Sequence, residues 1–183
     1  MNMLTDFIFY FLLAFHLKQK NMSTIYEKGN YTNAIAEEGV EVTHNKDKSI
    51  LNMMTVNQLI ETNFSSIDPN KTFRDLIPII ASSKRNIFPV VDKEGNFCGH
   101  VLLDDIRSIM FDQSIYNQFI LDFTVIPEYV INPDDPMEKI VKKFEVSGKY
   151  NIPVVKNRKY LGYMSRANVF SAYRAMLSEI SDD

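Results

Sequence analysis

Two stretches of the chain, Asn86-Ile-Phe-Pro-Val-Val91 and Tyr150-Asn-Ile-Pro-Val-Val155, follow one pattern, in which an apolar run passes through a proline into two valines. Their prolines are 64 residues apart, because 153 − 89 = 64. The same offset relates Ile67-Asp68-Pro69 to Ile131-Asn132-Pro133, since 133 − 69 = 64. Two motifs that recur at one offset indicate an internal duplication, and a duplication determines the architecture of the whole chain.

A glycine extends the repeat beyond the apolar runs. Gly99 recurs as Gly162, and here the offset is 162 − 99 = 63. The missing residue falls between the two motifs, where Asp92-Lys-Glu-Gly-Asn96 corresponds to the shorter Lys156-Asn-Arg-Lys159. A hairpin turn tolerates such a change in length. The duplication therefore continues through a predicted β-hairpin in each copy.

Each copy also predicts an amphipathic helix before its hairpin. In the first copy Thr72 and Asp75 resemble a capping box, and in the second Asp135 can cap a helix whose first position is Pro136. Pro78 lies inside the first helix, where a proline removes a hydrogen bond and costs ~3 kcal/mol, so we expect a kink or an early frayed turn. Apolar residues at the i, i+3, i+4, i+7 spacing predict the buried faces: Phe73, Leu76, Ile77 and Ile80, and Met137, Ile140, Val141 and Phe144.

Apolar runs predict the strands. A short first strand is expected in each copy, followed by a hairpin, at 64–67 with 87–91 and 97–102, and at 129–131 with 152–155 and 160–164. The hairpin strands are nearly all apolar, so both faces of each small sheet should be buried. A closing helix is expected to start at Asp104 or Asp105 in the first copy and after Ser165 in the second. One copy of roughly 60 residues buries too little surface to be stable alone, so the two should pack around a shared core.

The βαββα order, the Pro-Val-Val strand, and a glycine followed six residues later by Asp or Asn resemble the CBS domain. Two CBS copies normally associate as a Bateman module, and the resemblance covers about residues 55–175. It implies an α/β (α+β) fold in which two βαββα repeats pack with pseudo-two-fold symmetry. The expected divisions are an apolar helix (1–20), a linker (21–54), the first CBS domain (55–115), the second CBS domain (116–177) and a tail (178–183).

A narrower resemblance is to the cytoplasmic tail of bacterial CLC-type chloride channels and transporters. It rests on Thr43-His-Asn-Lys-Asp-Lys-Ser-Ile-Leu51, on Ser83-Lys-Arg-Asn-Ile-Phe-Pro-Val-Val-Asp-Lys-Glu-Gly95, and on Leu102-Leu-Asp-Asp-Ile-Arg107 with Ile109-Met-Phe111. In that family two CBS domains directly follow the last membrane helix. The ion-conducting region has no counterpart in this sequence, so the chain by itself cannot transport chloride.

An apolar run near the N-terminus, Phe7-Ile-Phe-Tyr-Phe-Leu-Leu-Ala-Phe15, is followed by Lys18 and Lys20. At ~1.5 Å per residue the run spans about half of a ~30 Å hydrocarbon core. Asp6 precedes it without any lysine or arginine, unlike the positive start of a signal peptide. Two interpretations stay open: a helix packed on the soluble part of the protein, or the cytoplasmic end of a membrane helix whose beginning is missing. The second agrees with the channel-tail resemblance and would place the module at the cytoplasmic face of the inner membrane.

The composition argues against several classes of function. A net charge of −3 and a pI near 5.6 do not fit a nucleic-acid-binding protein. His16, His44 and His100 lie in unrelated segments and form no metal-ligand pattern, and the 6 glycines form no phosphate-binding loop. Asp104 and Asp105 are adjacent at the start of a predicted helix, where their side chains point in different directions. We therefore expect no enzyme, no metal site and no required cofactor.

Two polar residues of the first hairpin have a structural interpretation. Cys98, the single cysteine, lies in an apolar strand-like run and is expected to be a small buried thiol rather than a reactive one. A lone thiol suits a reducing, cytoplasmic compartment. His100 lies in the same run and is expected to be a hydrogen-bonded residue of the core or of a groove.

The CBS resemblance implies ligand clefts between the two copies, which commonly take an adenine nucleotide. The Asp or Asn of the Gly-x₅-Asp/Asn motif would bind the ribose hydroxyls, and the residues before the Pro-Val strand of the other copy would line the base. Cleft one is predicted to comprise Asp105, Phe123, Thr124, Lys149, Tyr150 and Asn151. Cleft two is predicted to comprise Thr62, Arg85, Asn86, Ile87, Ser165 and Asn168.

The two clefts are unequal at the sequence level. In cleft one Tyr150 would stack on a purine and Lys149 would meet a phosphate, but Leu102 stands where Ser or Thr is usual. In cleft two Asn168 replaces the usual aspartate, and an amide accepts hydrogen bonds through one oxygen only. A structural interpretation also stays open: Asp105 and Ser165 are ordinary helix N-caps, Tyr150 is a plausible surface aromatic, and some CBS pairs bind nothing.

These observations support three hypotheses of function. The first is a regulatory, dimer-forming CBS pair of a CLC-type chloride channel or transporter, whose full-length parent contains a membrane channel domain. It would bind ATP, ADP or AMP, or would merely hold two subunits together. The second is a stand-alone CBS protein that senses a nucleotide. The third is a CBS module that regulates an enzyme or another partner in trans. All three predict a homodimer through the CBS pairs by resemblance, and none predicts a nucleic-acid partner.

Overall fold

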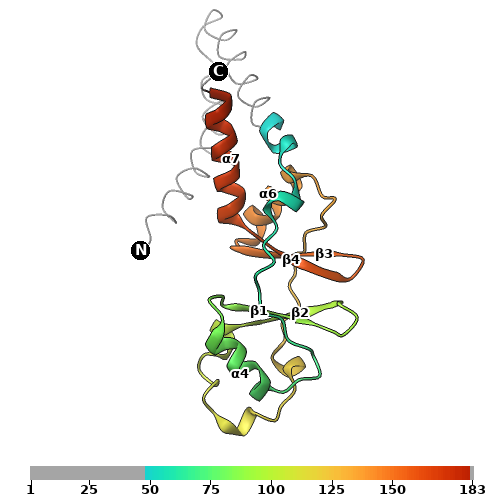
Figure 1. Cartoon of the computed structure of the whole chain (residues 1–183), viewed down its shortest axis with the longest axis vertical. Helices are drawn as coiled ribbons and strands as arrows, with labels where there is room; N and C mark the ends of the chain where they lie inside the picture. The colour runs from blue at the N-terminus through green and yellow to red at the C-terminus, as the bar shows by residue number, and fades with distance from the viewer. Residues whose placement is uncertain (1–47, 182–183) are drawn as a thin grey trace, which may run out of the picture. The chain divides into compact units, whose positions relative to one another are not determined.

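The computed structural model describes residues 48–181, which belong to one compact unit, Lys48–Asp183. The predicted apolar helix and most of the predicted linker, residues 1–47, lie outside the described residues. Residues 48–53 are helical. The further elements, most of them labelled in Figure 1, are α3 (Val56–Leu59), α4 (Phe73–Ser82), β1 (Ile87–Val91), β2 (Phe97–Leu102), α5 (Leu103–Ile106), the 3₁₀ helices η1 (Gln113–Ile115) and η2 (Ile120–Phe123), α6 (Met137–Ser147), β3 (Asn151–Lys156), β4 (Lys159–Ser165) and α7 (Arg166–Ser181).

Each repeat is built on one antiparallel hairpin, β1–β2 in the first repeat and β3–β4 in the second. The predicted hairpins are confirmed, and β3 and β4 are each longer than predicted. The predicted first strands shrink to single residues. Ile67 pairs in parallel with Val90 of β1, and Ile131 pairs in parallel with Val154 of β3. The duplication seen in the sequence is therefore a duplication of the fold.

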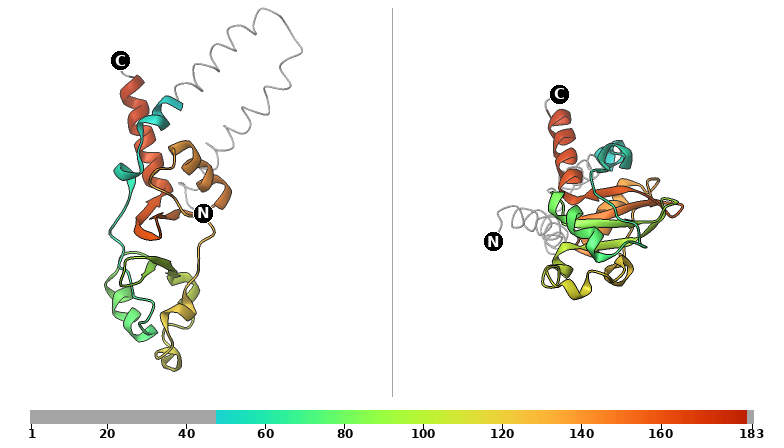
Figure 2. Two further views of the ribbon diagram at one scale, coloured as in Figure 1. Left: turned by 90° about the vertical axis from the view of Figure 1, so that its right-hand side faces the viewer. Right: turned by 60° about the horizontal axis from the view of Figure 1, so that its bottom comes forward.

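The chain crosses between the repeats twice. We call residues 60–64 the first crossing segment and residues 124–128 the second. Glu61 of the first segment exchanges two backbone hydrogen bonds with Tyr163 of β4, of 2.7 and 2.9 Å, although the chain after Glu61 enters the first repeat. Val125 of the second segment does the same with His100 of β2, at 2.9 and 3.0 Å. Each repeat thus completes its sheet with a segment that leads into the other, and Figure 2 (left) shows one connection along each side of the paired hairpins.

The repeated glycines are required by this crossing. Gly99 and Gly162 have φ values of +141° and +155°, which L side chains rarely adopt. A Cβ atom on Gly99 would stand 2.6 Å from the carbonyl oxygen of Val125, and one on Gly162 would stand 2.5 Å from that of Glu61. Both contacts are to backbone, which cannot move aside without breaking the sheet pairing. A glycine is therefore the residue that lets each crossing segment lie against the hairpin.

The hydrophobic core is divided between the repeats. One cluster of buried residues belongs to the first repeat and includes Phe73, Leu76 and Phe88, and another belongs to the second repeat and includes Ile140 and Ile152. The expectation of a single shared core is therefore wrong. The repeats are joined instead by the crossing segments, by pairing between the two hairpin turns, and by a layer of aromatic side chains.

This aromatic layer lies between the hairpins and is built from equivalent residues of the two repeats. Phe97 stacks on Tyr160, with ring centroids 5.7 Å apart, and His100 stacks on Tyr163, with ring centroids 6.2 Å apart. Both pairs are related by the repeat offset of 63, since 160 − 97 = 63 and 163 − 100 = 63. Phe64 packs on Tyr163 as well, at 4.6 Å. The pseudo-two-fold axis of the CBS-like pair therefore passes through this layer.

The amphipathic helices bury the predicted faces, but their starts differ from expectation. Asp75 accepts a hydrogen bond from the backbone N–H of Thr72, as predicted, and α4 continues past Pro78 to Ser82 rather than fraying early. In the second repeat Pro136 is the N-cap and α6 begins at Met137, so Asp135 does not cap it.

The Asp135 carboxylate is held by other groups. It accepts from the Asn132 N–H at 3.1 Å and from the Lys139 and Lys143 ammonium groups at 2.7 and 2.6 Å. Desolvation by burial raises the pKa of Asp135, but the hydrogen bonds from the two lysines more than offset it and lower the pKa to about 2. This carboxylate therefore links the turn before α6 to the helix through hydrogen bonds.

The closing helices differ in length and in their N-caps. Ser165 accepts a hydrogen bond from the Asn168 N–H at 3.1 Å, and α7 then has 16 residues. The equivalent residue in the first repeat is Leu102, which offers no side-chain acceptor, and α5 has only 4 residues. Asp105 lies inside α5, so its interpretation as an N-cap is wrong, whereas that of Ser165 is confirmed.

The ends of the described region are also structured. Residues 48–54 belong to the predicted linker, yet Ile50 and Met54 are buried in the core of the second repeat. Part of the predicted tail, residues 178–181, continues α7. Among residues 48–181, none of the helices combines the length and the apolar character needed to cross a lipid bilayer.

The crossing segments allow a direct test of the glycine requirement. We expect Gly99→Ala and Gly162→Ala each to lower the free energy of unfolding by about 3 kcal/mol or more, because the strained φ and the backbone clash add. Gly148→Ala is the matched control: Gly148 also has a positive φ of +65° but nothing lies within 4 Å of its added Cβ, so the loss should be about 1 kcal/mol. Urea unfolding of the three variants measures this, and equal losses in all three would contradict the close-approach argument.

Candidate ligand clefts between the two repeats

In cleft two, the polar side chains of the protein form hydrogen bonds with one another. The Arg85 Nη2 donates to Glu61 Oε2 at 2.6 Å and to Asn63 Oδ1 at 2.7 Å, and its guanidinium lies 4.7 Å from the centroid of the Phe64 ring. The Asn168 Nδ2 donates to Glu61 Oε1 at 3.0 Å. The structure therefore brings Arg85 of the first repeat and Asn168 of the second together, as the sequence predicts, but through a carboxylate between them.

Glu61 is the residue that the sequence reasoning missed. Its side chain is 15% exposed, and both of its oxygens accept hydrogen bonds. A signal was present in the repeat. Glu61 precedes the predicted cleft residue Thr62, and its counterpart 64 residues later is the apolar Val125, so the two crossing segments differ in charge at this position.

The other predicted residues of cleft two have ordinary structural positions. Thr62 is exposed on the first crossing segment. The Asn86 carbonyl accepts from the Leu103 N–H at 2.9 Å, and Ile87 opens β1. Ser165 caps α7. Of the six residues predicted for cleft two, Arg85 and Asn168 are the ones whose side chains donate hydrogen bonds to Glu61.

Cleft one contains charges that are not bound to each other. Asp105 and Lys149 are exposed, and within residues 48–181 neither side chain makes a hydrogen bond or an ion pair. Both charges act on the buried imidazole of His100. Desolvation is the main cause that lowers the pKa of His100 to about 4, the Lys149 charge lowers it further, and the Asp105 charge raises it. The charges of an acid from the first repeat and of a base from the second therefore both influence the pKa of the same imidazole.

Some of the remaining predicted residues of cleft one already contact other residues of the protein, and others are exposed to a ligand. Phe123 packs on Phe73 in the core of the first repeat, with ring centroids 4.7 Å apart, and the Thr124 hydroxyl donates to the Ile120 carbonyl at 2.8 Å. Asn151 opens β3. Tyr150 is 60% exposed, and the Arg166 guanidinium lies 5.4 Å from its ring centroid. Of these four side chains, Tyr150 is the one that offers a ring to a ligand.

A buried hydrogen bond joins the hairpins of the two repeats between the clefts. His100 Nδ1 and the Tyr163 hydroxyl are 2.9 Å apart, and the two residues are 8% and 0% exposed. The prediction that His100 is a hydrogen-bonded residue of the core or of a groove is confirmed. Cys98 is half-buried and not fully buried as predicted, but desolvation raises the pKa of its thiol, which agrees with the unreactive interpretation of this cysteine.

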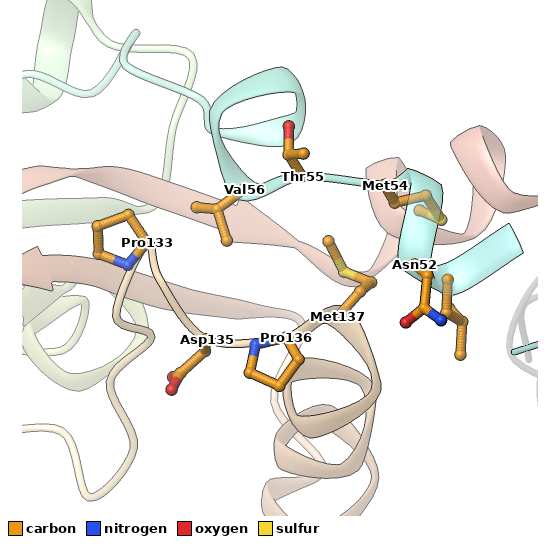
Figure 3. A pocket seen from close by; sticks show the side chains of 9 residues that line it. Asn52, Met54, Thr55, Val56, Pro133, Asp135, Pro136 and Met137 are labelled. Atoms are coloured by element: carbon orange, nitrogen blue, oxygen red, sulfur yellow. The ribbon is translucent and has the colours of Figure 1, made fainter. Parts of the chain in front are cut away.

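A pocket of about 170 Å³ lies away from both clefts. Figure 3 shows it between residues 51–56 and the start of α6, with Pro133, Pro136 and Met137 on one wall. Its one carboxylate, Asp135, is already held by two lysines. Within the described part of the chain, no cluster of three or more His, Cys, Asp or Glu side chains is arranged to hold a metal ion.

Comparison with known families identifies the module. Residues 56–112 and 122–175, more than half of the chain, match the CBS domain. The chain belongs to the CBS domain family. The two matched ranges coincide with the two repeats, so the protein contains a tandem CBS pair, a type of module that is regulatory and typically not catalytic. A search of curated proteins returned no significant match.

Solved structures resemble the CBS pair over most of their length. CbpB in complex with c-di-AMP is 15% identical, with a TM-score of 0.64, and the match covers 75% of this chain and 96% of that one. The CBS domain of a bacterial CNNM/CorC family Mg²⁺ transporter in complex with ATP is 14% identical, with a TM-score of 0.60 and coverage of 70% and 93%. CBSX2 in complex with AMP is 20% identical, with a TM-score of 0.57 and coverage of 67% and 97%. At these identities the likeness establishes the fold alone.

The His100 imidazole reports on cleft one without any ligand. We expect Lys149→Met to raise the pKa of His100, because a positive charge is removed, and Asp105→Asn to lower it, because a negative charge is removed. An NMR titration of the imidazole measures both. Lys142→Met, which removes an exposed lysine of α6 that is not among the causes of the His100 shift, is the control and should leave this pKa unchanged. If the pKa of His100 is the same in both variants as in the unmodified protein, these two charges do not face the same cleft.

Proposed function

We propose that the protein is a regulatory CBS pair that binds one adenine nucleotide in cleft one and acts on a partner in trans. The observation that carries the proposal is that Asp105 and Lys149 are both exposed, make no side-chain hydrogen bond or ion pair within residues 48–181, and both influence the pKa of His100. The two residues come from different repeats. A ligand that engages both would therefore tie the repeats together.

The chemistry of these residues suits a nucleotide. The Asp105 carboxylate can accept two hydrogen bonds from a ribose diol, and the Lys149 ammonium can donate to a phosphate. Tyr150 offers an exposed aromatic face, and Val125 and Ile126 of the second crossing segment are 43% and 81% exposed. A purine base is a flat group that such apolar surfaces can cover.

The comparisons support the choice of ligand class. The three similar structures hold c-di-AMP, ATP and AMP, and adenine is the group that these ligands have in common. They do not support the channel-tail interpretation, because none of the three comes from a chloride channel or a chloride transporter. The stand-alone alternative is therefore the better supported one, and the homodimer that the resemblance implies stays a prediction.

Nucleotide binding should raise the melting temperature. A ligand at 100 times its dissociation constant stabilises the folded state by about 2.7 kcal/mol, which corresponds to a rise of several degrees for a domain of this size. We expect this rise with at least one of ATP, ADP and AMP. Asp105→Ala should abolish it, whereas Asp104→Ala should keep it, since Asp104 is 77% exposed and pairs with Arg107. A constant melting temperature with all three nucleotides at millimolar concentration contradicts the proposal.

The stand-alone and channel-tail interpretations differ in what precedes the gene. A channel tail requires an in-frame sequence upstream of Met1 that encodes many apolar helices. A stand-alone regulator predicts a stop codon and a separate ribosome-binding site at that position. Sequencing the genomic region upstream of Met1 decides between them, independently of whether a nucleotide binds.

A further inference from the structure

Glu61 makes the two clefts differ, because it binds polar side chains in cleft two. Glu61 Oε2 accepts from Arg85 and Glu61 Oε1 accepts from Asn168, at 2.6 and 3.0 Å. By the CBS resemblance, these two partners are the groups that cleft two would offer to a nucleotide, a cation for the phosphate and an amide for the ribose. The carboxylate therefore already holds both of them.

Glu61 is fixed in this position by its backbone. Its N–H and its carbonyl are both bonded to Tyr163 of β4, and its carbonyl lies so close to Gly162 that no side chain fits there. The side chain consequently extends from an anchored point and is largely buried, at 15% exposure. A ligand cannot displace the first crossing segment without breaking the sheet of the second repeat.

The second crossing segment shows what the same position looks like without a carboxylate. The residue equivalent to Glu61 is Val125, and its backbone makes the same two bonds, to His100. The residue equivalent to Asn63, the other acceptor for Arg85, is Pro127. Lys149, the counterpart of Arg85, therefore has no acceptor on its crossing segment, and its ammonium stays unpaired within the described residues.

From this comparison we infer that Glu61 is a built-in anionic occupant of cleft two, which neutralises Arg85, holds Asn168 and excludes phosphate ligands. The CBS pair is then a single-site module, and the site count is set by one side chain of a crossing segment. This inference rests on the proposed function in one respect, which is the choice of ATP as the probe. The predicted gain of one site per chain does not depend on whether cleft one binds ATP.

Isothermal titration with ATP tests the inference through the number of sites per chain. We expect one site in the unmodified protein and two in Glu61→Ala. ATP should bind to cleft two at least tenfold more tightly in Glu61→Ala than in the unmodified protein. Adding Arg85→Ala to Glu61→Ala should remove the new site and leave the first. Glu145→Ala, which removes an exposed carboxylate from the outer helix α6, is the control and should leave one site.

The Asp105→Ala background separates this inference from the proposed function. There, Glu61→Ala should restore one site to a protein that has none. If cleft one never binds ATP, the unmodified protein has no site and Glu61→Ala has one, so the proposed function fails while the inference holds. If Glu61→Ala is folded and has the same number of sites as the unmodified protein, the inference is overturned.

The reciprocal substitution guards against a variant that does not fold. Val125→Glu places a carboxylate on the second crossing segment at the position equivalent to Glu61, where Lys149 is the counterpart of Arg85, and the residue is 43% exposed. Val125→Gln, of nearly the same size, measures the loss caused by removing an apolar residue from the cleft, and we expect Val125→Glu to bind ATP at least tenfold more weakly than Val125→Gln. Equal binding by both variants would mean that a carboxylate at this position does not close a cleft.

Discussion

The pairing of each crossing segment with the hairpin of the other repeat is the interaction on which the rest of the structure depends. Four backbone hydrogen bonds, two at Glu61 and two at Val125, complete both sheets and join the repeats. Because each repeat has its own hydrophobic core, no large shared core holds them together. The crossing, the aromatic layer and the paired hairpin turns do so instead, and the glycines of the repeat are the residues that permit the crossing.

The same crossing explains why the two clefts differ. Pseudo-two-fold symmetry gives them equivalent backbones, so the crossing segments meet the hairpins in the same way in both repeats. The side chains at the equivalent positions are a carboxylate and a valine. A backbone-anchored carboxylate satisfies the arginine and the amide in cleft two, while the lysine and the aspartate of cleft one stay available. A duplicated fold thereby acquires two different sites without any change in its architecture.

Much of the candidate site could be predicted because its residues are tied to repeat motifs. Asp105 and Asn168 follow the glycines at a constant spacing, and Arg85 and Lys149 precede the Pro-Val strands, so their placement follows from the duplication. The role of Glu61 could not be predicted in this way. Its importance depends on which hairpin its segment pairs with, and that pairing is with residues about a hundred positions away along the chain. The contacts of Phe123 with Phe73 and of the Thr124 hydroxyl with the Ile120 carbonyl likewise follow from tertiary packing and not from the repeat motifs.

The sequence by itself determined the repeat, the two hairpins, the buried faces of the helices and the membership of the CBS-like class. These follow from local periodicity and from the recurrence of short motifs, which need no knowledge of long-range contacts. Only the tertiary structure decided that the cores are separate and that Glu61 lies between Arg85 and Asn168. Those features depend on contacts between residues far apart in the chain, and a single sequence contains no direct record of such contacts.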